Sequence, residues 1–259
     1  MSTALITGAS AGIGAAYAKR LAARGHDLVL VARSTEKLTA LALDLQTRHD
    51  IKVEAITCDL SDPVQLQELA RRIRIAPPAD ILINNAGTNV PGGFVDTADE
   101  DLERLIRLNM TAPTLLAHAA IAGMASRGSG AIVNISSVIG VATEITSGIY
   151  GATKAYLLTL SQSLTHEFGA AGVYVQAVLP GATRTDIWQH AGLDISQING
   201  LMEVDDLVDA ALVGFDRRET VTIPPLPDVH QWEAFETARL AMRPNFANSK
   251  PAARYRAPS

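Results

Sequence analysis

The stretch Thr7-Gly8-Ala9-Ser10-Ala11-Gly12-Ile13-Gly14 decides the fold of this chain of 259 residues. It lies between a short apolar run, residues 4–7, and a helix-sized segment, residues 13–24, in which apolar and small residues recur at helical spacing. Glycines let a backbone turn tightly, and a helix that begins beside them points free N–H groups at bound phosphates. The stretch therefore predicts a dinucleotide-binding turn between the first strand and the first helix of a parallel sheet.

The glycine turn has two alternative interpretations. Its spacing is G-x-x-x-G-x-G rather than the commoner G-x-G-x-x-G, and residues 8–12 also match the G-x-S-x-G elbow of hydrolases. Only seven residues precede Gly8 in this sequence, so we expect no upstream loop that could complete the oxyanion hole of a hydrolase. A tight strand–helix turn without a ligand is the second alternative.

Strand-sized and helix-sized segments alternate along the rest of the chain. Further strands are expected at 27–32, 53–57, 80–84, 131–135, 173–179 and 220–223, and helices at 35–48, 62–75, 97–127, 150–169 and 204–215. The 97–127 helix is expected to open with a capping box, Thr97-x-x-Glu100. The alternation predicts a single α/β domain over residues 1–242, a doubly wound, Rossmann-like parallel sheet of about seven strands with helices on both faces.

Composition excludes several classes of protein. The 22 basic and 27 acidic residues give a net charge of −5, which argues against nucleic-acid binding. The apolar runs are too short to span a membrane, and the scattered histidines predict no catalytic metal. With a single cysteine, Cys58, the fold cannot depend on an intrachain disulfide, and we expect a cytoplasmic protein. Residues 243–259 contain four basic residues and no acid, and predict a solvated or subunit-packing tail.

The residues after the second strand indicate which dinucleotide binds. An NAD-binding enzyme would carry an acid there, whereas this chain has Arg33 and Ser34 and no carboxylate. A guanidinium can pair with a 2′-phosphate in bidentate fashion, which predicts NADP(H) as cofactor. After the third strand, Asp59 and Leu60 are expected at the adenine, although Asp59 could instead cap the next helix. Asn85-Ala86-Gly87 are expected to line the cofactor after the fourth strand.

Tyr150 and Lys154 are expected to supply proton-transfer chemistry. They lie four residues apart on an expected helix and therefore on one face. The ammonium can favour the phenolate and lower the tyrosine pKa, which suits proton transfer near neutral pH. An ordinary surface pair is the alternative. Ser136 and Ser137, at the end of the fifth strand, could each hydrogen-bond a substrate carbonyl or simply cap a turn.

These motifs, in this order, resemble the short-chain dehydrogenase/reductase family. The resemblance rests on Thr7-Gly8-x-x-x-Gly12-x-Gly14, Asn84-Asn85-Ala86-Gly87, Asn109, Ser137, Tyr150-x-x-x-Lys154 and Pro180-Gly181-x-x-x-Thr185. It implies a catalytic tetrad of Asn109, Ser137, Tyr150 and Lys154. Tyr150 would transfer the proton, Ser137 would hold the substrate oxygen, Lys154 would bind the nicotinamide ribose, and Asn109 would hold a relaying water through its main chain.

The resemblance also implies the remaining cofactor contacts and the assembly. The residues expected to bind cofactor are Gly8, Ser10, Ala11, Gly12, Ile13, Gly14, Arg33, Ser34, Asp59, Leu60, Asn85, Ala86, Gly87, Tyr150, Lys154, Pro180, Gly181, Thr183 and Thr185. A lid is expected over about residues 186–201, with Trp188 and His190 either facing the substrate or packing within the lid. The long helices from Thr97 and from Tyr150 would form subunit contacts, in a homotetramer or, as the alternative, in a dimer.

The expected activity is interconversion of a ketone or aldehyde and an alcohol with NADP(H). The stretch next to Ser137, residues 138–149, has one charge, Glu144, and no Lys or Arg, which favours a small neutral substrate. A 3-oxoacyl carrier-protein reductase is one alternative, although it would need a basic landing surface for the carrier. A non-catalytic NADP(H)-sensing regulator is the other, and it would fit better had a tetrad residue been lost.

Overall fold

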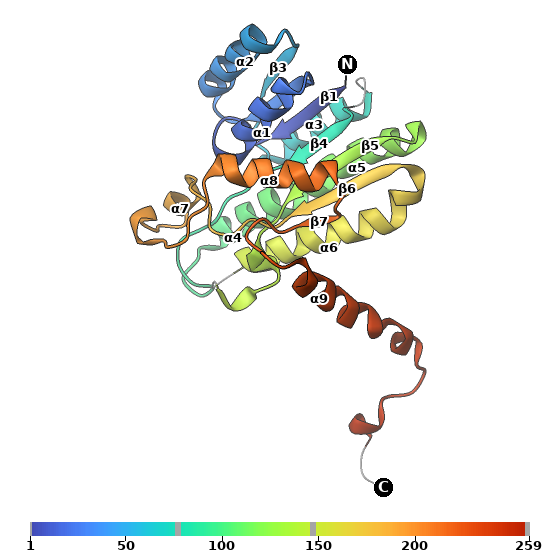
Figure 1. Ribbon diagram of the computed structural model, residues 1–259. Coiled ribbons are helices and arrows are strands. Elements are labelled where there is room, and N and C mark those ends of the chain that lie inside the picture. Colours follow the sequence, from blue (N-terminus) through green and yellow to red (C-terminus); the bar gives the residue numbers. More distant parts are fainter. Residues whose placement is uncertain (1, 76–78, 146–148, 257–259) are drawn as a thin grey trace. The chain divides into compact units, whose positions relative to one another are not determined.

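The structure is a computed structural model that describes residues 2–75, 79–145 and 149–256 (Figure 1). It divides into two compact units, Met1–Pro224 and Pro225–Ser259. In the described residues, no helix is long and apolar enough to cross a membrane.

The first unit is built on one seven-stranded sheet with the order β3-β2-β1-β4-β5-β6-β7. All strand pairs are parallel, which confirms the predicted doubly wound α/β fold. The strands are β1 (Thr3–Thr7), β2 (Asp27–Ala32), β3 (Val53–Thr57), β4 (Ile81–Asn84), β5 (Gly130–Ile135), β6 (Val173–Val178) and β7 (Val221–Thr222). Because the strands are parallel, their carboxyl ends meet at one edge, the edge at which such sheets bind ligands.

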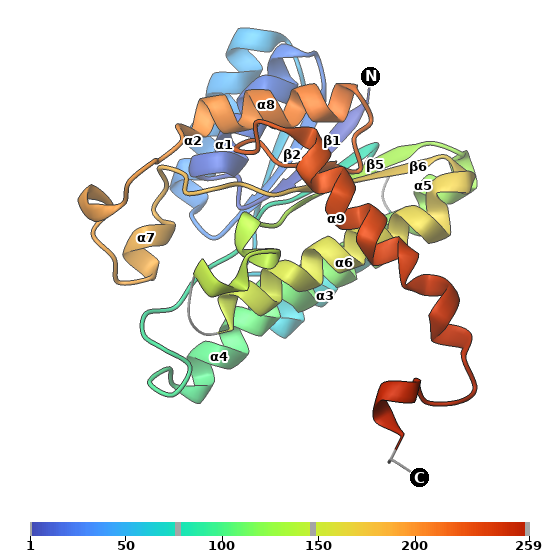
Figure 2. The ribbon, with the colours of Figure 1, turned by 60° about the horizontal axis from the view of Figure 1, so that its bottom comes forward.

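Helices cover both faces of the sheet. They are α1 (Gly12–Ala23), α2 (Thr35–His49), α3 (Pro63–Ile75), α4 (Asp99–Ile106), α5 (Ala112–Arg127), α6 (Tyr150–Phe168), α7 (Ile187–His190) and α8 (Val204–Asp216). One core packs α1, α2 and α8 on the sheet, and a second packs α3, α5 and the end of α6 on the opposite face. Figures 1 and 2 show α8 beside α1, where Arg20 on α1 donates a 2.6 Å hydrogen bond to Asp209 on α8.

The predicted helix from Thr97 to Arg127 is wrong in two details. The chain is helical only from Asp99, and the hydroxyl of Thr97 donates to the Gly93 carbonyl at 2.8 Å instead of capping the helix. The capping box therefore does not form. A π-helical turn, η1 (Arg107–Thr111), then separates α4 from α5. Such turns are frequent at functional sites, and this one contains the buried Asn109.

The second unit begins earlier than the tail expected from the sequence. It contains α9 (Val229–Ala241), which has no buried residue among those described. Two short 3₁₀ turns, Arg243–Ala247 and Ala253–Tyr255, follow it. The division at 224/225 differs from the expected boundary at 242/243 because α9 contributes nothing to either core of the sheet.

Candidate active site

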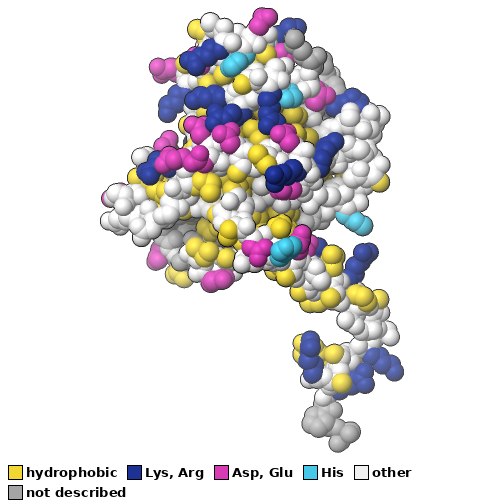
Figure 3. Space-filling model, in the orientation of Figure 1, with side chains coloured by type: hydrophobic (Ala, Val, Ile, Leu, Met, Phe, Trp, Pro, Cys, Tyr) yellow, Lys and Arg dark blue, Asp and Glu magenta, His cyan; other side chains and the backbone are white. Residues whose placement is uncertain are grey.

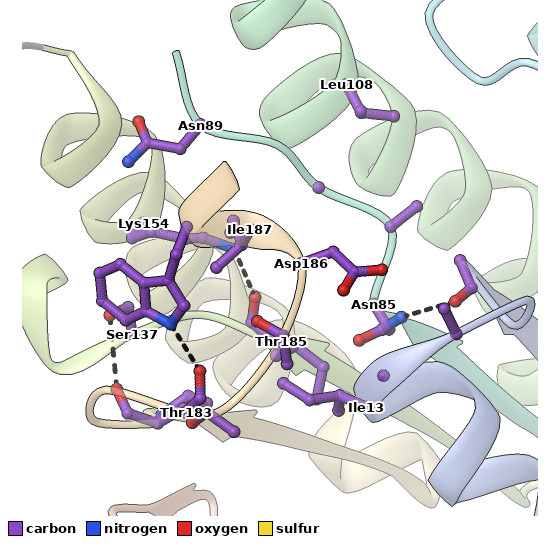
Figure 4. A pocket seen from close by; sticks show the side chains of 18 of the residues that line it. Ile13, Asn85, Asn89, Leu108, Ser137, Lys154, Thr183, Thr185, Asp186 and Ile187 are labelled. Carbon is purple, nitrogen blue, oxygen red and sulfur yellow. Dashed lines mark hydrogen bonds between the residues drawn. The ribbon is translucent and has the colours of Figure 1, made fainter. Parts of the chain in front are cut away.

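A cavity of about 890 Å³ lies at the carboxyl edge of the sheet and gathers nearly all the residues predicted from the sequence. Its lining includes Gly8, Ser10, Ala11, Gly12, Ile13, Arg33, Ser34, Asp59, Leu60, Asn85, Ala86, Gly87, Ser137, Tyr150, Lys154, Pro180, Gly181, Thr183 and Thr185. Two of the predicted residues, Gly14 and Asn109, do not line the cavity. Figure 4 shows side chains from the glycine turn, β4, β5, α6 and the segment after β6 converging on one space.

The glycine turn provides a backbone cradle at one end of the cavity. Gly8 has φ +65°, and a Cβ built on it would lie 2.8 Å from Asn85 Nδ2. Gly14 is equally constrained, because a Cβ there would overlap the Gly8 carbonyl oxygen. Asn85 Nδ2 itself donates to the Thr7 carbonyl oxygen at 2.9 Å, so Asn85 fixes the turn as well as lining the cavity. The absence of side chains at these glycines, beside the N-terminus of α1, fits a dinucleotide pyrophosphate.

A cationic edge lies at the start of α2. Arg33 is exposed and lines the cavity with Ser34. The structure adds Lys37, which also lines the cavity and which the sequence analysis did not single out. The sequence could have indicated Lys37, because it lies in the first turn of α2, four residues after Arg33. The two cations line the cavity, whereas Glu36 in the same turn does not, and this arrangement fits a 2′-phosphate.

Two acids in the segment after β3, Asp59 and Asp62, have different roles. Asp62 Oδ1 accepts from the backbone N–H groups of Val64 and Gln65 at 2.8 and 3.0 Å, so Asp62 caps α3. Asp59 lines the cavity, and its carboxylate accepts from the Ser61 hydroxyl and N–H at 2.6 and 2.9 Å. Asp59 is therefore at the expected adenine end and is already fixed by the turn. The Cys58 thiol before it is buried, and burial raises its pKa to about 11.

The structure distinguishes the two serines after β5. Ser136 Oγ donates to the Lys154 carbonyl oxygen at 2.6 Å and so ties β5 to α6. Ser137 Oγ accepts from the Ile139 N–H at 3.3 Å and makes a longer contact of 3.4 Å with the Pro180 carbonyl. The hydroxyl of Ser137 is thus the more weakly held, and Figure 4 shows it at the cavity. Its position supports the choice of Ser137 for the substrate oxygen.

Tyr150 and Lys154 lie together on α6 as the spacing predicts. The Lys154 ammonium is 5.5 Å from the centre of the Tyr150 ring and donates to the Ile135 carbonyl oxygen at 3.0 Å. Burial lowers the pKa of Lys154 to about 8. Burial also raises the pKa of Tyr150 above its ordinary value, contrary to the expected lowering. Desolvation disfavours the phenolate more than the nearby ammonium stabilises it, so Tyr150 holds its proton at neutral pH.

Asn109 and Thr153 brace these two residues from behind. The Asn109 amide donates to the Thr88 carbonyl at 2.9 Å and to Thr153 Oγ1 at 3.1 Å, and its oxygen accepts from the Thr88 N–H at 2.9 Å. Thr153, which is fully buried, donates in turn to the Tyr150 carbonyl at 2.8 Å. Thr153 was missed in the sequence because a threonine inside Y-x-x-x-K gives no signal of its own.

Apolar side chains also line the cavity that contains Tyr150. They come from the loop after β5, from α7 and the segment after it, and from η1: Val138, Ile139, Ile145, Ile187, Trp188, Leu193 and Leu108. Within the expected lid, Trp188 Nε1 donates to the Thr183 carbonyl at 2.7 Å, so this indole packs inside the lid while it lines the cavity. The side chain of His190, and residues 146–148, lie outside the described part.

Comparison with known proteins gives matches along most of the chain. Residues 2–195 match the family model described as short chain dehydrogenase. The 3-oxoacyl-(acyl-carrier-protein) reductase FabG of Rickettsia bellii is 36% identical over 71% of this chain and 74% of that protein. For other curated relatives, at 32–33% identity, the chain spans 54% of their length.

Two solved structures align with nearly the whole chain. A short-chain dehydrogenase from Sphingobium yanoikuyae in complex with NADPH is 53% identical, with a TM-score of 0.96 over 99% of this chain and 100% of that one. The bulky-bulky ketone specific alcohol dehydrogenase from Comamonas testosteroni is 47% identical, with a TM-score of 0.92 over 98% of each chain. Solved relatives at 28–32% identity align over only 86%. With the family's motifs gathered in one cavity and its model matching three quarters of the sequence, the chain belongs to the short-chain dehydrogenase family.

Proposed function

We propose that the chain reduces neutral ketones with large apolar groups on both sides of the carbonyl, using NADPH. The observation that carries this proposal is the lining of the cavity near Tyr150. Val138, Ile139 and Ile145 line it from one segment, and Ile187, Trp188 and Leu193 line it from another. Apolar walls on two segments suit a ketone with two apolar substituents better than a methyl ketone. The name of the Comamonas testosteroni relative supports the same substrate class.

The charges in the cavity support a neutral substrate. Arg184 lines it, but its guanidinium donates to Glu203 at 2.8 Å. Asp186 contributes a negative charge to the lining, which would repel an anionic ketone. The Lys154 ammonium already donates to the Ile135 carbonyl and would also contact the cofactor ribose and Tyr150, so it would not bind an anionic substrate.

The chain's own residues would carry out the proton chemistry. NADPH, when bound, supplies the hydride. The Tyr150 hydroxyl donates a proton to the carbonyl oxygen, and the Ser137 hydroxyl holds that oxygen in place. Burial keeps Tyr150 protonated at neutral pH, which is the state that reduction requires. The positive charge of Lys154 stabilises the phenolate left behind. Arg33 and Lys37 would bind the 2′-phosphate.

A graded set of carbonyl compounds tests the substrate class. We expect aryl alkyl ketones with long alkyl chains, and ketones with two bulky groups, to have higher kcat/KM values than acetone or acetophenone. Ketones that carry a carboxylate should react least. A preference for small methyl ketones or for anionic ketones would overturn the proposal.

The same measurement separates the alternatives. A β-ketoacyl thioester as the best substrate would indicate the reductase activity named for the Rickettsia bellii relative. NADPH binding without turnover of any carbonyl compound would indicate a sensing role. A homotetrameric assembly and a cytoplasmic location stay predictions.

A further inference from the structure

The second unit, here called the arm (residues 225–259), exposes apolar and basic side chains together. Phe246 is 75% exposed and Tyr255 is 71% exposed. Residues 237–259 contain five basic side chains, Arg239, Arg243, Lys250, Arg254 and Arg256, and no acid. Figure 3 shows dark blue and yellow side chains along this part of the arm. An exposed apolar surface of this kind marks an interaction site.

A groove in the first unit has the complementary chemistry. It has a volume of about 350 Å³ and is lined by Pro63, Leu66, Gln67, Glu103, Ile106, Arg107, Thr111 and Leu115. We call it the α3–α4 groove. A cavity of about 150 Å³ is enough to hold a benzene ring in another protein, so this groove can receive an aromatic side chain.

The segment that contributes Glu103 to the α3–α4 groove is acidic. Residues 96–103 contain five acids, Asp96, Asp99, Glu100, Asp101 and Glu103, and no basic residue. Glu103 lines the groove, and Asp99 precedes it by four residues on α4 and thus lies on the same face. Arg107, the one cation in the lining, is held by Glu103 at 3.3 Å. In the described residues, Asp99 and Glu100 have no ion-pair partner, in contrast to Asp101, which pairs with Arg104 at 2.7 Å.

We propose that the arm of one copy of this chain docks in the α3–α4 groove of a second copy. Tyr255 would enter the apolar groove, and Arg254 and Arg256 on either side of it would face Asp99 and Glu100. The helix α9 in the arm has 13 residues and is about 20 Å long. Identical chains form closed oligomers when two surfaces of the chain are complementary.

The distribution of the arm among relatives agrees with this role. The two solved relatives at 53% and 47% identity align over 99% and 98% of this chain, so their alignments include the arm. Relatives that align over 86% match a share equal to the first unit. The alignments at 53% and 47% identity thus extend over the arm, whereas those at 28–32% identity leave 14% of this chain unmatched. The inference is independent of the proposed substrate.

A disulfide test between two differently tagged copies examines the contact itself. One copy carries Tyr255→Cys and the other Ile106→Cys, and the two are co-expressed as full chains and oxidised. We expect a mixed disulfide between the two tags. Leu43→Cys, at an exposed site on α2 that is 65% exposed, replaces Ile106→Cys as the matched control and should give none. The native Cys58 is buried and should not compete.

Two results of this test would overturn the proposal. One is an equal yield with the Leu43→Cys control. The other comes from a variant that carries Tyr255→Cys and Ile106→Cys in the same chain. If its disulfide forms only within single chains and never between two chains, the arm binds its own chain and the proposal is wrong.

A charge exchange provides the second, independent readout. Arg254→Glu with Arg256→Glu should raise the concentration at which the oligomer dissociates by about tenfold, measured by sedimentation. Adding Asp99→Lys and Glu100→Lys to the same chain should return the dissociation concentration to that of the wild type. Higher salt should weaken the wild-type assembly. Activity per subunit shows that each variant is folded, and an unchanged oligomer in the charge-reversed arm would contradict the proposal.

Discussion

The two ends of the active-site cavity select their ligands by different physical means. At the cationic edge, Arg33 and Lys37 are exposed, so their charges act through solvent and each contributes modestly. At the catalytic end, Lys154 is 5% exposed and Asn109 1% exposed, and the side chains of both form hydrogen bonds to neighbouring segments. Removal of the Tyr150 hydroxyl at the buried end should therefore cost more than a change at the exposed edge.

The largest effect is expected from Tyr150→Phe, which removes the proposed proton donor and leaves the ring in place. Ketone reduction should fall by about a hundredfold to ten-thousandfold, while NADPH binding persists. Tyr156→Phe is the matched control, because Tyr156 lies on the same helix and its hydroxyl contacts Thr114 at 2.7 Å, outside the cavity lining. A near-normal kcat in Tyr150→Phe would show that the Tyr150 hydroxyl does not donate the proton.

The double variant Arg33→Ala/Lys37→Ala should weaken NADPH binding by about tenfold to a hundredfold, because charge-assisted hydrogen bonds to a phosphate are lost. NADH binding should hardly change. Titration calorimetry with both nucleotides measures the difference. Arg48→Ala is the control, since Arg48 lies at the far end of α2 and pairs with Asp44. Equal losses for NADPH and NADH would show that this edge does not read the 2′-phosphate.

Thr153→Val should lower kcat by about tenfold, because it leaves the Asn109 amide without one acceptor and removes the side-chain hydrogen bond to the Tyr150 carbonyl. KM for the ketone should change little, and the pH profile of kcat/KM should shift. Thr153→Ser keeps the hydroxyl and should restore both. A loss of stability with an unchanged pH profile would reduce Thr153 to a packing role.

The smallest effect concerns stability between about pH 8 and 10. The folded-state pKa of Lys154, about 8, is below its ordinary value of 10.5, so the unfolded chain binds more protons in this window. Stability should therefore rise with pH, by up to about 1 kcal/mol per pH unit. Lys154→Met removes this contribution, and urea unfolding of both proteins at several pH values measures it. Parallel curves for the two would contradict the lowered pKa.

The contrast between the two ends also explains what the sequence could predict. The glycine turn, Arg33 and the Tyr150–Lys154 pair follow from local spacing on strands and helices whose order the alternation already gives. Thr153 and the π-turn at Asn109 depend on contacts between distant segments, which no local pattern encodes. The rise in the Tyr150 pKa has the same origin, because it depends on how deeply α6 is buried. The Thr97 capping box does not form because the helix begins at Asp99 with Ala98 as its N-cap, and the Thr97 hydroxyl donates to the Gly93 carbonyl instead.

Helix α9 was missed for a related reason. Its apolar residues follow no clean helical stripe, and none of its described residues is buried. The sequence of the arm indicated only a basic, proline-containing tail. A docking role for its exposed aromatic side chains could be proposed only after the structure had shown the α3–α4 groove.

The most direct measurement follows the consumption of NADPH and NADH, side by side, with one ketone that is bulky on both sides, in the wild type and in Tyr150→Phe. We predict a higher kcat/KM with NADPH than with NADH, and loss of the reaction in the variant. A preference for NADH, or turnover that survives in Tyr150→Phe, would contradict the account of both ends of the cavity.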